Sequence, residues 1–300
     1  MTSPARPRPT SAHRSPWPGP RPVPDPGLFG PGSVSWRLHG DPVLVMGGLR
    51  ALMLQSMHPD VVLGFVQNSG YQQDWWGRLN RTAEYVGLTT FGTRAEIDAV
   101  ARRVRYAHAT FRFTDADDGR ERRLDEPELL LWVHCALVDS IVHVARRSGL
   151  ELTGRDADTY LAEQVRFAEL VGLDPTTVPD SEAALADYMQ DMAPVLRLDA
   201  AGKEAISSLL APPLRPVVEL ATPARLGWST LAGITFATLP PAVLALFPAA
   251  FRAGPSAVPP QAVSAALRTI RLTGQGVRAV VPALRRSPME NAARRRLGIA

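Results

Sequence analysis

Apolar residues recur every three or four positions along nearly all of this sequence, and that helical period is the feature that most constrains the fold. Few stretches alternate apolar and polar residues in the way that half-buried strands do. The sequence therefore predicts an all-α protein. With 300 residues, of which 45% are hydrophobic, the chain is long enough to bury a large core. We expect a single helical domain over residues 33–290.

The two ends of the chain differ in composition from this helical region. Residues 1–32 contain ten prolines and lack the apolar run of a signal peptide, which predicts a disordered tail and no secretion signal. Residues 291–300 are arginine-rich, which predicts a basic surface tail. The single cysteine, Cys135, allows no internal disulfide, so we expect a cytoplasmic protein, with membrane association as an open alternative.

Charge and hydropathy limit the partners. The net charge is only +4, and the arginine-rich end has no aromatic residues to stack on bases, so we predict no nucleic-acid partner. Residues 226–251 are uncharged and numerous enough to cross a bilayer, but Pro240, Pro241 and Pro248 divide them. We expect buried helices there, with peripheral membrane contact through a surface hairpin, or a true span, as alternatives.

Two predicted helices each carry a histidine among their apolar residues. Thr93 and Glu96 form a capping-box pattern before a stripe that includes His108. Asp125 and Glu128 repeat the pattern before a stripe that includes His134. Both histidines are therefore expected to face the core, where an imidazole commonly bonds a backbone carbonyl and has no further role. A cofactor ligand is the alternative interpretation.

Familiar catalytic motifs do not fit the sequence. Gly227-Trp228-Ser229-Thr230-Leu231 lacks the closing glycine of a nucleophile elbow. The chain has no Glu-x-x-His pair, so a di-iron or zinc site of that kind lacks ligands at the required spacing. An axial haem histidine needs no such spacing, because the porphyrin supplies four of the iron's ligands. Arg78 and Thr82, four residues apart, are expected on one helix face.

Several motifs resemble, in order, those of one known family. They are Gly40-Asp41-Pro42, Gln55-Ser56-Met57-His58-Pro59, Asn68-Ser69, Arg78-Leu79-Asn80-Arg81-Thr82, Thr90-Phe91-Gly92-Thr93, His108 and the run from Glu128 to Ser140. With these motifs the chain resembles the MpaB-type oxygenase family, which includes the rubber oxygenases, over roughly residues 33–290. The resemblance implies an all-helical protein with a globin-like core that holds haem b through a histidine.

The resemblance also implies roles for individual residues. His108 corresponds to the axial iron ligand, and Arg78 and Thr82 correspond to an Arg-x-x-x-Thr pair at the cofactor. His134 is the alternative ligand or a residue beside the ligand. His58 is expected on the opposite face, with the Arg78–Thr82 helix, where dioxygen and substrate would enter.

The sequence departs from the rubber oxygenases at two positions. Arg81 occupies the place of a lysine that can cap the iron, and a guanidinium that keeps its proton is a poor iron ligand. The glutamate that serves those enzymes as a base falls near Val62 here, and Asp60 or Asp74 would have to replace it, unless the reaction uses no base.

The function that follows from the resemblance is a haem b-dependent oxygenase, with Arg78, Arg81 and Thr82 as the catalytic candidates. It would use dioxygen to oxidise an apolar small molecule, including unsaturated ones. The alternatives are a non-catalytic helical protein that binds haem or a lipid-like ligand, and a helical protein without a cofactor.

Overall fold

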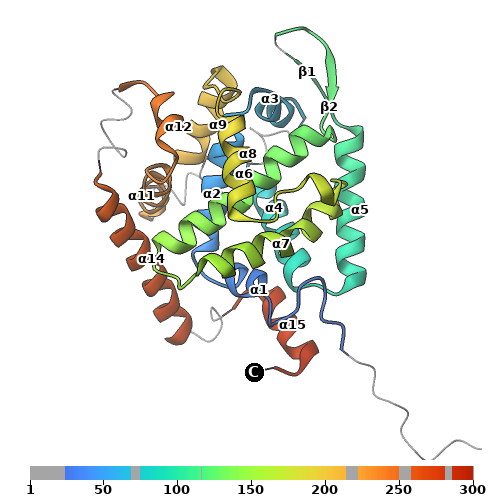
Figure 1. Cartoon of the computed structure of the whole chain (residues 1–300). Helices are drawn as coiled ribbons and strands as arrows, with labels where there is room; N and C mark the ends of the chain where they lie inside the picture. Colours follow the sequence, from blue (N-terminus) through green and yellow to red (C-terminus); the bar gives the residue numbers. More distant parts are fainter. Residues whose placement is uncertain are drawn as a thin grey trace, which may run out of the picture.

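The protein is described here by a computed structural model that covers residues 24–68, 75–115, 117–213, 222–249, 258–280 and 286–299 (Figure 1). Its helices are α1 (Val34–His39), α2 (Leu44–Gln55), α3 (Pro59–Asn68), α4 (Trp75–Phe91), α5 (Arg94–Thr110), α6 (Pro127–Arg147), α7 (Gly154–Val171), η1 (Pro175–Thr177), α8 (Glu182–Met192), α9 (Ala200–Leu210), α11 (Ala224–Phe236), α12 (Pro241–Ala245), α14 (Pro260–Val280) and α15 (Pro288–Leu297). The predicted all-α class is confirmed.

The strands of the described residues form one antiparallel hairpin between α5 and α6. In it, β1 (Arg112–Thr114) pairs with β2 (Glu121–Arg123), so that Phe113 lies opposite Arg122. The sequence predicts only a polar turn in this region. Gly119 adopts a positive φ of 70° in the loop that joins the strands, a conformation that glycine adopts without steric cost.

Helix α6 crosses the middle of the molecule and packs along α2 (Figure 1). The two backbones approach closely at Gly47, where an added Cβ would lie 3.2 Å from the Cα of Ile141. Among the described helices, only α6 has the length and hydropathy to cross a membrane, and 67% of its most apolar window is buried inside the protein. Its apolar character is therefore explained by its central position in the bundle.

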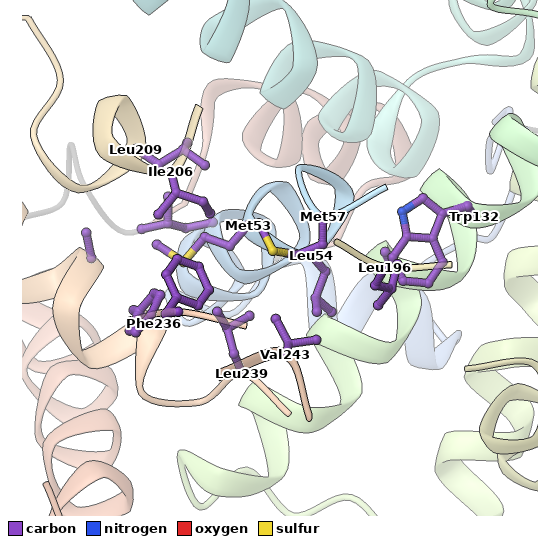
Figure 2. Close-up of a cluster of buried hydrophobic side chains, with 14 residues drawn as sticks. Met53, Leu54, Met57, Trp132, Leu196, Ile206, Leu209, Phe236, Leu239 and Val243 are labelled. Carbon is purple, nitrogen blue, oxygen red and sulfur yellow. The ribbon is translucent and has the colours of Figure 1, made fainter. Parts of the chain in front are cut away.

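The largest core cluster joins α2 and α6 to the C-terminal helices. Figure 2 shows that Met53, Met57 and Trp132 share this cluster with Phe236 and Val243. The uncharged stretch predicted from residue 226 onward supplies α11 and α12, which are separated near Pro240 as expected from its prolines. Its described apolar residues Phe236, Leu239, Val243 and Phe247 are buried in the core.

The start of α5 follows the sequence prediction, and the start of α6 does not. Thr93 and Glu96 form a complete capping box. At α6 the predicted box is wrong, because the N-cap is Glu126, without a side-chain cap, and Pro127 occupies the first turn. The Asp125 carboxylate instead accepts a hydrogen bond of 2.6 Å from Arg123 Nε. The ion pair holds the group that would otherwise cap the helix.

The ends of the domain are more ordered than the composition predicts. Residues 1–23, the greater part of the predicted tail, lie outside the described residues. In residues 24–32, however, Leu28 is buried and Asp25 accepts a hydrogen bond of 2.7 Å from the Arg94 amide. Most of the predicted basic C-terminal tail belongs to α15. There Ala293 is buried and Arg296 donates to the carbonyl oxygens of Phe91 and Gly92.

Candidate functional site

One turn of α4 has no buried face. The side chains from Asn80 through Glu84 are all exposed, although a helix in a bundle normally buries one stripe. Arg81 and Thr82 lie in this turn. Arg78 lies on the same helix, and its side chain is outside the described part of the chain. The arrangement leaves both a guanidinium and a hydroxyl accessible to a ligand.

The next residue of α4 returns to the interior. The ring of Tyr85 makes an edge contact with the ring of Phe167 on α7, with centroids 5.4 Å apart. The Tyr85 hydroxyl is buried and has no hydrogen-bond partner among the residues that the structure describes. Burial raises its pKa, so the phenol keeps its proton and can donate a hydrogen bond.

His134 of α6 also lies next to Phe167. The centroids of the His134 and Phe167 rings are 6.1 Å apart. His134 is only 4% exposed, which confirms that it points inward. Both of its ring nitrogens are buried without a hydrogen-bond partner in the described residues, and burial lowers its pKa to about 4. The imidazole is therefore neutral at pH 7, with both nitrogens available to a ligand or a water molecule.

His108 lies on α5, which packs against both α4 and α7. It is half-buried, so the prediction that it faces the core is only partly met. The stripe that includes it ends at Phe111, which is exposed. The helices that carry Thr82, His108 and Phe167 therefore contact one another in pairs, and α7 also contacts α6, which carries His134.

The structure does not bring His58 together with His134. His58 is buried against Trp132 of α6, with ring centroids 6.2 Å apart, and burial, with a smaller contribution from Arg197, lowers its pKa to about 4. Trp132 precedes His134 by two positions, which is a rotation of roughly 200° around the helix. The two histidines therefore occupy different sides of α6.

Asp60, one of the two candidate bases, lies beside the hairpin. Asp60 lies 4.0 Å from Arg122 of the hairpin. Burial raises its pKa, the charge of Asp115 raises it further, and the Arg122 charge opposes both effects. Asp74 lies outside the described residues. In the described part of the chain, no three His, Cys, Asp or Glu side chains form a group that could hold a bare metal ion. A porphyrin-bound iron needs no such group.

Sequence reasoning missed Tyr85 and Phe167 as members of the site. Tyr85 lies three positions after Thr82, and this helical spacing could have drawn attention to it. Phe167 belongs to α7, outside every motif of the resemblance, and only the packing of α7 on α6 brings it to His134.

The comparison with known families identifies the family of the chain. The family described as "ER-bound oxygenase mpaB/B'/Rubber oxygenase, catalytic domain" matches residues 36–272. The chain belongs to this family. The match runs from α1 into α14 and includes all the helices that carry the candidate residues. No curated protein and no solved structure matches the chain. Membership of the mpaB/rubber oxygenase family makes this an oxygenase domain, an oxidoreductase that uses oxygen and a substrate.

Proposed function

We propose that this member of the mpaB/rubber oxygenase family binds haem b and uses dioxygen to oxidise an apolar small molecule. The observation that carries the proposal is His134. A buried neutral imidazole without hydrogen bonds among the described residues is costly, and native proteins seldom leave such a group unsatisfied. A ligand that accepts an electron pair would satisfy one ring nitrogen, and the N–H of the other would still need a hydrogen-bond acceptor.

The residues around His134 fit a haem group. Haem has a broad apolar face and two carboxylates at one edge, so it needs aromatic or aliphatic walls and cationic or hydroxyl donors. Phe167 and Tyr85 supply aromatic surface next to His134. The exposed turn of α4 supplies the Arg81 guanidinium and the Thr82 hydroxyl. These groups come from helices that the family match includes.

The roles of the residues follow from their chemistry. By the resemblance, His108 would hold the haem iron, and His134 would be the alternative ligand or a neighbour that orients the group. When bound, haem iron supplies the binding and activation of dioxygen. Arg78 and Arg81 would bind the haem carboxylates or orient oxygen through their guanidinium groups. Tyr85 would donate a hydrogen bond, and Phe167 would exclude water from the apolar substrate.

The test begins with the visible absorption spectrum and a pyridine haemochrome assay on the purified full-length chain. We expect about one haem b per chain, and loss of haem in His108→Ala, His134→Ala or both. His143→Ala is the matched control, because His143 is also on α6 and burial also lowers its pKa to about 4, yet it lies roughly 180° around the helix from His134. Circular dichroism of each variant separates haem loss from unfolding.

The outcomes distinguish the alternatives. Loss from His108→Ala alone would assign the ligand suggested by the resemblance, and loss from His134→Ala alone would assign the buried imidazole. A haem-loaded protein that consumes no oxygen with any supplied apolar substrate would be a non-catalytic binder. A colourless protein that takes up no added haem would refute the cofactor assignment.

A further inference from the structure

A cleft of about 330 Å³ lies where α1, α14 and α15 meet, apart from the group around His134. Figure 1 shows the three helices gathered at the end of the molecule where the chain terminates. Arg278, Arg286 and Arg294 line the cleft, and all three lie beyond residue 272, where the family match ends. The cleft is therefore lined both by residues of the matched oxygenase domain and by arginines that follow this domain in the chain.

Two of the other charged residues in the cleft are neutralised by partners outside it. Arg271 Nε lies 2.9 Å from the carboxylate of Asp41. Asp156 lies 3.2 Å from the guanidinium of Arg37. Neither Asp156 nor Arg271 lines the cleft. Asp41 and Arg37 therefore add little net charge to it.

The remaining charges do not cancel. Glu290 is only 7% exposed, and its Oε1 atom lies 3.4 Å from Arg286 Nε and 3.7 Å from Arg294 Nη1. The carboxylate faces Gly40, where an added Cβ would lie 3.6 Å from Oε2. Arg278 also acts electrostatically on Glu290. Three guanidinium groups therefore line the cleft beside a single buried carboxylate, so the lining is rich in positive charge.

Donors remain for a ligand. Arg278 donates one hydrogen bond, of 2.7 Å, to the Gly40 carbonyl, whereas a guanidinium has five N–H groups. An open cleft that is rich in positive charge and planar donors is the kind of site that binds oxyanions.

We propose that this cleft binds a phosphate group. A phosphomonoester carries about two negative charges near pH 7 and presents three acceptor oxygens, so it offers this arginine-rich lining more charge and more acceptors than a single carboxylate does. Guanidinium forks bind phosphate oxygens in pairs. The phosphate could be free in solution or the headgroup of phosphatidic acid in a membrane, and both offer the same chemistry to the arginines.

The test uses isothermal titration of the full-length chain with inorganic phosphate, in a phosphate-free buffer of low ionic strength at pH 7.5. Arg278→Gln and Arg286→Gln should each weaken binding about tenfold, because each removes a charge-assisted contact. Glu290→Gln should strengthen binding several-fold, because it removes the competing carboxylate. Arg102→Gln, at an exposed position on α5 outside the cleft lining, should leave the affinity unchanged.

Membrane sedimentation then separates the two sources of phosphate. If the ligand is the lipid headgroup, the wild-type chain should sediment with vesicles of phosphatidylcholine and phosphatidic acid, and Arg278→Gln should not. If the ligand is free phosphate, neither protein should sediment with the vesicles. Thermal unfolding of each variant shows that it is folded, and Arg286→Gln provides a second variant should Arg278→Gln unfold. An affinity that is undetectable, or is equal in all the variants, would overturn the proposal.

Discussion

Removing the acid of the buried ion pair between α2 and α6 should destabilise the protein more than removing its base. Arg50 is 2% exposed and donates to Asp139 at 2.6 Å, to Ser140 Oγ at 2.9 Å and to the Thr238 carbonyl at 3.2 Å. The Asp139 side chain is 28% exposed, so water can hydrate its carboxylate if the arginine is lost. The Arg50 guanidinium has no such access.

These differences set the expected free energies. Asp139→Ala leaves a buried cation without a counter-charge, which costs about 3–5 kcal/mol of unfolding free energy. Arg50→Met keeps the volume filled and leaves a carboxylate that water can hydrate. It also removes the hydrogen bonds to Ser140 and Thr238, so the expected loss of unfolding free energy is roughly 2–3 kcal/mol. The double variant should cost at least about 1 kcal/mol less than the sum of the two single variants.

Urea denaturation followed by circular dichroism measures these costs from the shift in midpoint at constant slope. Arg37→Met is the control, because Arg37 is 44% exposed and pairs with Asp156 at the surface, where the expected loss is below about 1 kcal/mol. The reasoning fails if Asp139→Ala costs less than Arg50→Met, or if the surface variant costs as much as the buried one.

Three further predictions concern other parts of the fold. Gly47→Ala should destabilise the protein by about 1–3 kcal/mol despite alanine's helix propensity, because the new Cβ would lie 3.2 Å from the backbone of Ile141; an unchanged denaturation midpoint would contradict the close approach of the two helices. Thr93→Ala should cost about 1 kcal/mol through loss of the capping box, measured in the same way, and Thr93→Ser should restore most of it. Stability should be greatest above about pH 6.5 and fall toward pH 4, because the unfolded chain protonates its histidines near 6.5, whereas burial lowers the pKa values of His39 and His134 to about 4. Each should contribute on the order of 3 kcal/mol across this window, and urea midpoints that stay level between pH 7 and pH 5 would refute the assignment.

Local signals in the sequence predicted the helices well where one signal acted alone. The Thr93–Glu96 capping box follows from residues within one turn. At Asp125 the same kind of pattern failed, because Pro127 sets the first turn and Arg123 holds the carboxylate. The spacing of residues alone does not show which of two competing local interactions is the stronger.

The site was predicted in part. Helical periodicity placed His134 in the interior, because it depends only on positions within one helix. Periodicity does not say which helix meets a given face, so Phe167 and Tyr85 could not be assigned to His134 from the sequence. The same limit applies to His58, which lies on a different side of α6. The order of the α15 segment was missed because its few apolar residues pack against distant helices.

The contacts of Arg296 bear on when the bundle closes during synthesis. Its guanidinium binds the carbonyl oxygens of Phe91 and Gly92, at the corner between α4 and α5, and the carbonyl of Asp25. Arg296 follows Phe91 by 205 residues. While the C-terminal segment is still inside the ribosome, the carbonyls at this corner have only water as partners. The corner is therefore completed after translation has passed residue 296, and a nascent chain with α4 and α5 already formed still lacks the contact that joins both ends of the domain.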